Sequence, residues 1–207
     1  MMQTGNAEPV KPSEEVVVSF SGPFSWPGML DAPSVFFDAE VRRLSGIYLW
    51  TVPLPEGHLI YYVGETERSF EVRLLEHYKE HATCMYHLYS PAEFARGEKV
   101  VMWPGRYDSA DRKSIKECIA QYAKFSSLAN EIAHIYRFFL APLSCEQRIR
   151  RRIEAAIAGA LYAAPGLAGI FQDRGIHYAP KTADEAPLGC VLTSPVPLIG
   201  LPERIWA

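Results

Sequence analysis

Two tyrosines, an arginine, a histidine and a glutamate are residues whose types could take part in chemistry on a phosphodiester bond. An arginine pairs with phosphoryl oxygens through its planar guanidinium. A carboxylate can hold magnesium, which keeps most of its waters and accepts a single protein ligand. A tyrosine or a histidine can orient the attacking water or accept its proton. These candidate residues are Tyr48, Tyr62, Arg73, His77 and Glu154.

A predicted β-hairpin positions the two tyrosines. Residues 46–52 and 58–64 are apolar runs, and the proline- and glycine-containing segment 53–57 joins them, which predicts two antiparallel strands. Because side chains alternate along a strand, each tyrosine should share a face with the residues two positions away. The residues expected on these faces are Gly46, Tyr48 and Trp50 on the first strand and Ile60, Tyr62 and Gly64 on the second.

A predicted helix follows the hairpin and carries the arginine and the histidine. Apolar residues recur at intervals of three over residues 69–79, a spacing that favours a helix. Arg73 and His77 are four residues apart, so they should lie on one face, one turn apart.

The glutamate lies on a second predicted helix, after a strand over residues 134–143. Ser144 and Gln147 have the spacing of a capping box, and Pro165 ends the helix. Glu154 follows an arginine-rich segment and precedes an almost chargeless one, 155–161. A carboxylate at that junction could face a cleft, and the alternative is a surface ion pair with an arginine one turn away.

The order of these motifs resembles the GIY-YIG endonuclease family. Gly46-Ile47-Tyr48 stands on the first strand, Tyr62-Val63-Gly64 on the second, and Arg73, His77 and Glu154 follow on helices. The resemblance extends over residues 45–81 and 135–161. Each tripeptide alone is common, whereas the ordered set with matching secondary structure is more specific.

The resemblance implies an α+β fold, with a small mixed or antiparallel sheet flanked by helices. It implies a metal-dependent endonuclease that hydrolyses DNA, with Tyr48, Tyr62, Arg73, His77 and Glu154 as catalytic residues. Glu154 would bind Mg²⁺ or Mn²⁺, Arg73 would contact the phosphate, and Tyr48 would orient the water or take its proton. Tyr62 would position water or phosphate, and His77 would hold Tyr62 or relay a proton.

Two departures from the family pattern support an alternative function. The family has an asparagine after a proline beyond the glutamate, but here that neighbourhood is Pro165-Gly166-Leu167, and position 65 carries Glu65. The alternative is a catalytically weakened domain that binds nucleic acid or protein. An unrelated α+β protein also stays open, because each of the five residues alone has an ordinary structural role in a strand or on a helix.

The arginine-rich segment before Glu154 offers a candidate surface for DNA. Arg148 and Arg151 are predicted to bind the nucleic-acid backbone, which basic residues contact. The alternative is a solubilising helix face that pairs with nearby acids. The net charge of −3 argues against a nucleic-acid packaging protein, but not against an enzyme with a local basic patch.

Length and composition predict one domain with additions. The 207 residues contain 48% hydrophobic and 22% charged residues, with no run long enough to span a membrane. The four cysteines lack a zinc-binding spacing, and we expect a reduced cytoplasmic protein. We expect a flexible leader over residues 1–14 and a single domain over 15–207. That domain has a core at 45–81 and 134–165, an insertion at 90–133 and a wrapped C-terminal tail at 166–207.

Further elements are expected outside the motifs. A valine-rich run predicts a first strand over residues 15–20, and prolines and glycines predict a loop over 22–31. The insertion should contain a short strand within 99–103 and a helix over 114–129, because apolar residues recur with helical spacing in the latter.

Overall fold

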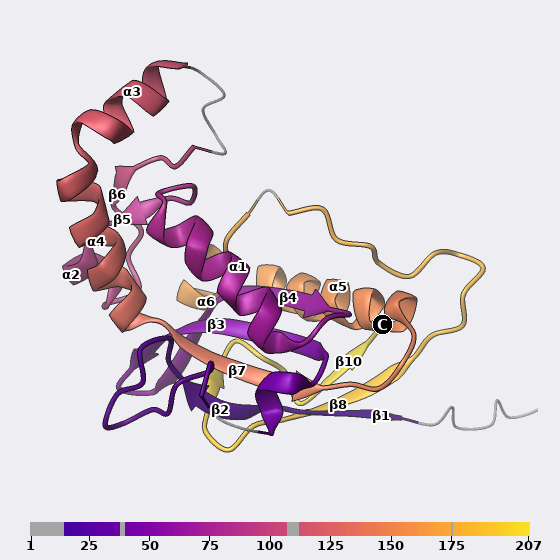
Figure 1. The fold of residues 1–207 in the computed structure, drawn as a ribbon. Coiled ribbons are helices and arrows are strands. Elements are labelled where there is room, and N and C mark those ends of the chain that lie inside the picture. The colour runs from indigo at the N-terminus through magenta and orange to yellow at the C-terminus, as the bar shows by residue number, and fades with distance from the viewer. Residues whose placement is uncertain (1–14, 38–39, 107–111, 175) are drawn as a thin grey trace, which may run out of the picture.

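The computed structural model describes residues 15–37, 40–106, 112–174 and 176–207. The predicted leader over residues 1–14 lies outside the described residues. The fold is α+β, with small mixed sheets flanked by helices, as expected (Figure 1). Within the described part of the chain, no helix has both the length and the apolar character that a membrane span needs.

The predicted hairpin forms the centre of a five-stranded sheet. β3 and β4 pair in antiparallel fashion, and β7 pairs with the other side of β3. Two short strands complete the sheet, since β2 pairs with β7 and β9 pairs in parallel with the first residues of β4. In spatial order the strands are β2 (Ser21–Phe24), β7 (Arg137–Pro142), β3 (Gly46–Leu54), β4 (Gly57–Thr66) and β9 (Leu198–Ile199).

A bulge interrupts the register of the hairpin. Trp50 pairs with Tyr62 and Thr51 pairs with Ile60, so Tyr61 is an additional residue on β4. Tyr61 and Tyr62 consequently line the same cavity, whereas Ile60 packs in the core on the opposite face. The prediction that Ile60 shares a face with Tyr62 is therefore wrong, because a bulge breaks strict alternation.

The two faces of the sheet bury different cores. On one face, Tyr48 packs in an aromatic core beneath α1 (Phe70–Ala82) and α4 (Tyr122–Ile135). On the other, Leu49 packs in an aliphatic core beneath α5 (Gln147–Ala163). The predicted helices carrying Arg73 and Glu154 are thus confirmed, and they cover opposite faces of the sheet.

The predicted insertion builds a lobe at one end of the sheet (Figure 1). The expected helix over 114–129 is two helices separated at Gln121, and the second continues to Ile135. For that reason the strand expected over 134–143 begins only at Arg137. The other elements of this lobe are β5 (Leu88–Tyr89), α2 (Pro91–Phe94), β6 (Val101–Trp103) and α3 (Arg112–Ala120).

The two chain ends contribute more regular structure than the sequence predicts. The expected loop over 22–31 overlaps β2, and the tail supplies strands to two sheets. In the second sheet β8 pairs in parallel with β1, which confirms the predicted first strand, and in antiparallel fashion with β10. The remaining elements are β1 (Val16–Ser19), the 3₁₀ turn η1 (Val41–Arg43), α6 (Leu167–Phe171), β8 (Gly189–Thr193) and β10 (Arg204–Trp206).

The two site helices begin differently. α1 has a side-chain cap, because Ser69 Oγ accepts a hydrogen bond from the backbone N–H of Val72. The N-cap of α5 is Glu146, and its side chain makes no capping bond. The predicted capping box of Ser144 and Gln147 is therefore wrong.

Candidate functional site

The hydroxyl of Tyr48 is the point at which the predicted residues meet. Its oxygen lies 2.8 Å from Nε2 of His77 and accepts a hydrogen bond from Nε of Arg73 at 3.2 Å. The rings of Tyr48 and Tyr62 lie 6.0 Å apart between centroids. Tyr48 itself is fully buried, whereas Tyr62 and Arg73 are partly exposed. Solvent therefore meets this group of residues through Tyr62 and Arg73.

Gly64 leaves the space that the two tyrosine rings occupy. A Cβ atom at this position would lie 2.4 Å from Cζ and Oη of Tyr48 and 2.7 Å from Cε1 of Tyr62. Because Gly64 is the cross-strand partner of Tyr48, a side chain here would collide with both rings. The glycine of the Tyr62-Val63-Gly64 motif is thus required by the packing of the site.

The buried stripe of α1 determines how deep its functional residues lie. Phe70, Leu74, His77 and His81 are its buried residues, and their spacing forms one face of a helix. His77 consequently points into the core, while Arg73 lies at the margin of the stripe with 31% of its side chain exposed.

A chain of hydrogen bonds continues behind His77. Its Nδ1 lies 2.7 Å from the hydroxyl oxygen of Tyr86, and that hydroxyl donates to the carboxylate of Glu80. Since Tyr86 donates to Glu80, its oxygen accepts from Nδ1–H of His77. The neutral imidazole then presents an unprotonated Nε2 to the hydroxyl of Tyr48. Sequence analysis missed Tyr86 because it lies beyond the end of α1, where no helical spacing connects it to His77.

Burial fixes the charge states of this pair. Burial and the positive charge of Arg73 lower the pKa of His77 to about 3, so its ring is neutral at pH 7. Burial raises the pKa of Tyr48 well above its usual value, so its hydroxyl keeps its proton. Both states agree with donation from Tyr48 to Nε2 of His77.

Glu154 approaches the site around the edge of the sheet. Its Oε1 accepts a hydrogen bond of 2.9 Å from the backbone N–H of Glu65 on β4. Burial, followed by the negative charge of Glu65, raises the pKa of Glu154 to about 7. The positive charge of Arg73 lowers the pKa of Glu154 and so opposes these two effects. The negative charge of Glu154, in turn, adds to the effect of burial in raising the pKa of Tyr62. The carboxylate is thus within electrostatic reach of both residues.

A cavity of about 190 Å³ opens beside these groups. Tyr62, Arg73 and His77 line it, while Tyr48 lies behind His77 and Glu154 is not part of the lining. The structure thus joins Tyr48, Arg73 and His77 directly, with Tyr62 against them. It leaves Glu154 at the adjacent strand edge rather than in the same cavity.

The position of Glu154 is compatible with a magnesium ion. Its Oε1 is occupied by the N–H of Glu65, and its Oε2 has no protein partner among the described residues. Magnesium accepts one carboxylate and completes its octahedron with water and phosphate oxygens. Within the described residues there is no cluster of three or more histidine, cysteine, aspartate or glutamate side chains that would hold a metal by itself.

The predicted DNA-contacting arginines have different environments. Arg148 donates to both oxygens of Glu185 and, at 2.8 Å each, to the carbonyls of Ala179 and Pro180. These bonds anchor the tail to α5 through the guanidinium of Arg148, and the contact of Arg148 with DNA stays a prediction. Arg151 is half exposed and lies 3.4 Å from Glu65, so its contact with DNA stays a prediction.

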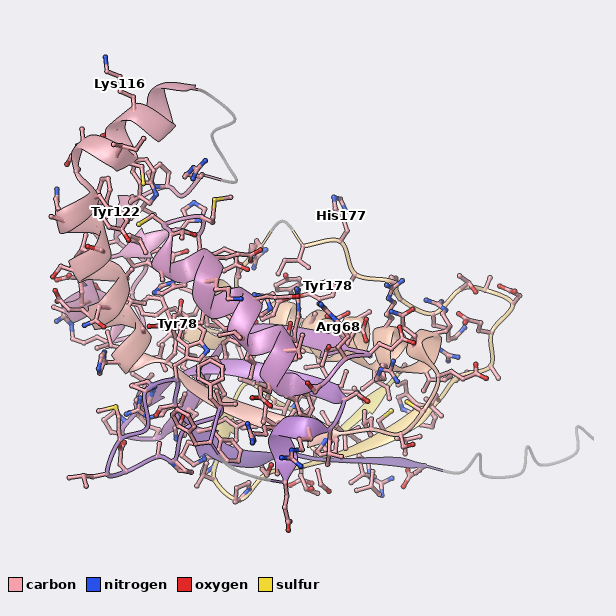
Figure 2. All side chains as sticks on the ribbon, viewed as in Figure 1. Arg68, Tyr78, Lys116, Tyr122, His177 and Tyr178 are labelled. Carbon is pink, nitrogen blue, oxygen red and sulfur yellow. The ribbon has the colours of Figure 1, made fainter. Side chains whose placement is uncertain are left out.

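The tail passes along the outer edge of β4, beside the site. The N–H of Asp173 donates to the carbonyl of Tyr61 at 2.7 Å, and the hydroxyl of Tyr178 donates to the carbonyl of Val63 at 3.4 Å. Figure 2 shows His177, between them in sequence, pointing away from the body of the molecule. The sequence gives no signal for this arrangement, in which the tail satisfies groups at the edge of β4 that lie beyond the two residues paired with β9.

Comparison with protein-family models, with curated proteins and with solved structures gave no match to this chain. The resemblance to GIY-YIG endonucleases therefore stays a prediction, and the geometry of the five residues is the basis for a functional proposal.

Proposed function

We propose that this chain is a metal-dependent endonuclease that hydrolyses DNA phosphodiester bonds through a GIY-YIG-type active site. One observation carries the proposal: the Tyr48 hydroxyl is held between Nε of Arg73 and the unprotonated Nε2 of neutral His77. This arrangement links a phosphate-binding cation to a hydrogen-bond acceptor of fixed tautomer through one buried atom.

Arg73 is the residue that meets the scissile phosphate. Its Nε is directed to Tyr48 and its Nη1 to Glu76 at 3.4 Å. Among the described residues, Nη2 of Arg73 has no hydrogen-bond partner. Because the guanidinium is partly exposed, Nη2 can donate a hydrogen bond to a non-bridging phosphate oxygen. Charge that develops on the phosphoryl oxygens in the transition state is stabilised there.

The tyrosines and the histidine handle the proton of the attacking water. The complete burial of Tyr48 favours the partly exposed Tyr62 as the residue that meets this water. Burial raises the pKa of Tyr62, and the contact with Tyr48 opposes this with a smaller effect, so the Tyr62 hydroxyl keeps its proton. Neutral His77, held by Tyr86 and Glu80, fixes the direction of the Tyr48 hydroxyl, and Tyr48 packs against Tyr62 and so helps to orient the proton of this water.

Glu154 is the proposed ligand for Mg²⁺ or Mn²⁺ through its Oε2. The bound metal would supply positive charge beside the phosphate and lower the pKa of a coordinated water. Glu154 must be ionised for this purpose, and a pKa of about 7 keeps a large fraction ionised near neutral pH.

A nucleic-acid-binding module without catalysis is the second candidate. Glu65 lies 3.4 Å from both Arg150 and Arg151, and this pairing neutralises basic groups next to the site. Such a module needs the phosphate contact of Arg73 but not the ordered hydrogen bonds between Tyr48 and His77.

Incubation with supercoiled and branched DNA, with and without Mg²⁺ or Mn²⁺, distinguishes the two. We expect metal-dependent nicking by the wild type and none by Glu154→Gln, which removes the metal's ligand. Glu146→Gln, an exposed glutamate at the start of the same helix, is the matched control and should cleave normally. DNA binding without cleavage by the wild type would support the module, and unimpaired cleavage by Glu154→Gln would refute the metal assignment.

A further inference from the structure

The cavity beside Arg73 has walls made of aromatic rings. Three strand residues contribute to it, and the bulge allows both consecutive tyrosines of β4 to do so. Two more rings come from the segments after α1 and α4. The five rings belong to Trp50, Tyr61, Tyr62, Tyr86 and Tyr136.

The size of the cavity matches a single planar ring. Its volume is about 190 Å³, and an enclosed protein cavity of about 150 Å³ holds benzene. A six-membered heterocycle with small substituents therefore fits, whereas a two-ring purine would project from the opening. Aromatic walls favour such a ligand, because every base has a face that stacks on them.

The cavity also offers polar groups to a heterocycle. His87 and Asp173 line the cavity as well, so the walls can distinguish one edge of a base from another.

Arg73 joins this cavity to the proposed chemistry. It lines the cavity and is partly exposed, and its Nη2 is available to a phosphate as described above. A nucleotide whose base enters among the rings would therefore have its own phosphate beside Arg73. The cavity and the cation together suit a base with its attached phosphate rather than an apolar molecule.

We propose that the cavity takes a pyrimidine base turned out of the DNA helix, with an adjacent phosphate on Arg73. The proposal rests on the proposed function, in that DNA is taken as the substrate. Turning out a base costs stacking and pairing energy, which aromatic walls and edge contacts offset. The base would then fix which phosphate meets Arg73 and Tyr62.

The first test measures binding of mononucleotides by calorimetry in metal-free buffer. The ligands are thymidine 5′- and 3′-monophosphate, with deoxyribose 5-phosphate and inorganic phosphate as baseless controls. We expect at least one thymidine monophosphate to bind about ten-fold or more tightly than deoxyribose 5-phosphate, the scale of base stacking on aromatic side chains. Equal affinities would overturn the base-binding cavity.

Ile176 and His177 provide a matched pair of variants. Ile176 lines the cavity from the tail. The neighbouring His177 is not part of the lining, is exposed, and points away from the body of the molecule (Figure 2). Ile176→Trp should fill the cavity and abolish the preference for thymidine monophosphate, with deoxyribose 5-phosphate bound as before. His177→Trp adds the same indole outside and should keep the preference. If Ile176→Trp does not fold, Ile176→Phe and His177→Phe make the same comparison.

The second test uses duplex DNA with one T·T mismatch, whose bases turn out at lower cost than paired ones. Without metal, the wild type should bind the mismatched duplex more tightly than the matched one, and Ile176→Trp should not distinguish them. Retention of the preference by Ile176→Trp would overturn the proposal. These binding outcomes are independent of cleavage. A protein that cleaves no DNA but prefers thymidine monophosphate would refute the proposed nuclease function and support the base-binding cavity. A protein that cleaves DNA without this preference would support the nuclease function and refute the base-binding cavity.

Discussion

The phenolic oxygen of Tyr48 and Nε2 of His77 lie 2.8 Å apart, although 29 residues separate them in sequence. Tyr48 is fully buried, so its hydroxyl cannot exchange His77 for water without opening the core. The contact fixes α1 against β3 and also sets the protonation of the site. Changes to either residue, or to the groups behind them, should therefore alter both stability and chemistry.

His77 should be neutral, with its proton on Nδ1, throughout the physiological range. Its pKa is lowered to about 3 by burial and by Arg73, so acidification from pH 7 to pH 5 should not protonate it. Nitrogen-15 NMR of the imidazole measures the tautomer directly. An Nε2–H tautomer, or titration near pH 6.5, would contradict the proposed direction of the hydrogen bonds.

Tyr86→Phe should disturb this tautomer, because it removes the acceptor of Nδ1–H. A buried donor left unpaired costs about 1–3 kcal/mol of folding stability, and cleavage should slow as Nε2 becomes partly protonated. Tyr122→Phe is a suitable control, since Tyr122 is exposed on α4. Urea unfolding and single-turnover cleavage of the two variants provide the comparison, and equal behaviour would exclude a positioning role for Tyr86.

Arg73→Ala should lower turnover far more than DNA affinity. A donor that acts on transition-state charge contributes about 100- to 1000-fold to the rate, whereas one phosphate contact among several changes the salt dependence of binding by about one unit. Arg73→Lys keeps the charge but loses the planar fork, so an endonuclease should regain little activity. Single-turnover cleavage and binding at two salt concentrations measure both effects. A binding defect in Arg73→Ala, with no cleavage by the wild type, would favour the module.

Metal affinity should depend on pH through Glu154. Its pKa is raised to about 7, and only the ionised carboxylate binds metal. The apparent affinity for Mn²⁺ should fall about ten-fold for each pH unit below 7 and level off above it. Titration at pH 5.5, 6.5 and 7.5 tests this, and a constant affinity across that range would exclude Glu154 as the ligand.

The same shift affects stability without metal. Because the folded-state pKa of Glu154 is above its ordinary value of 4.5, its contribution to folding stability is present below pH 4.5 and is lost as pH rises through 7. Glu154→Gln does not titrate, so the wild type should lose stability relative to this variant between pH 5 and pH 8. Urea unfolding at the two pH values measures the difference.

Gly64→Ala should damage the site by displacing two rings. The added Cβ would meet Tyr48 at 2.4 Å, and overpacking of this kind costs about 1–3 kcal/mol. Gly159→Ala is the control, because a Cβ at Gly159 in α5 meets nothing within 4 Å. That variant should instead be more stable, by about 0.5–1 kcal/mol. Thermal unfolding should show lower stability for Gly64→Ala and higher stability for Gly159→Ala, and DNA cleavage should be impaired only in Gly64→Ala. Normal cleavage by Gly64→Ala would indicate that the positions of the two tyrosines are not critical.

The sequence by itself determined the local elements that carry the site. Turn residues and apolar runs predicted the hairpin with Tyr48 and Tyr62, and helical spacing put Arg73 and His77 on neighbouring turns of α1. These features depend on backbone geometry within a single element, so a repeating pattern of residues is sufficient to predict them.

Only the tertiary structure decided how these elements meet. The bulge at Tyr61 directs two consecutive tyrosines toward one cavity. Tyr86 contacts His77 from the segment that follows α1. Arg148 donates hydrogen bonds to backbone carbonyls of the tail. Glu154 comes around the strand edge from the opposite face of the sheet. Each outcome depends on the simultaneous packing of two cores against one sheet. This packing selects one strand register and one set of edge contacts, whereas the sequence pattern of any single element is compatible with several.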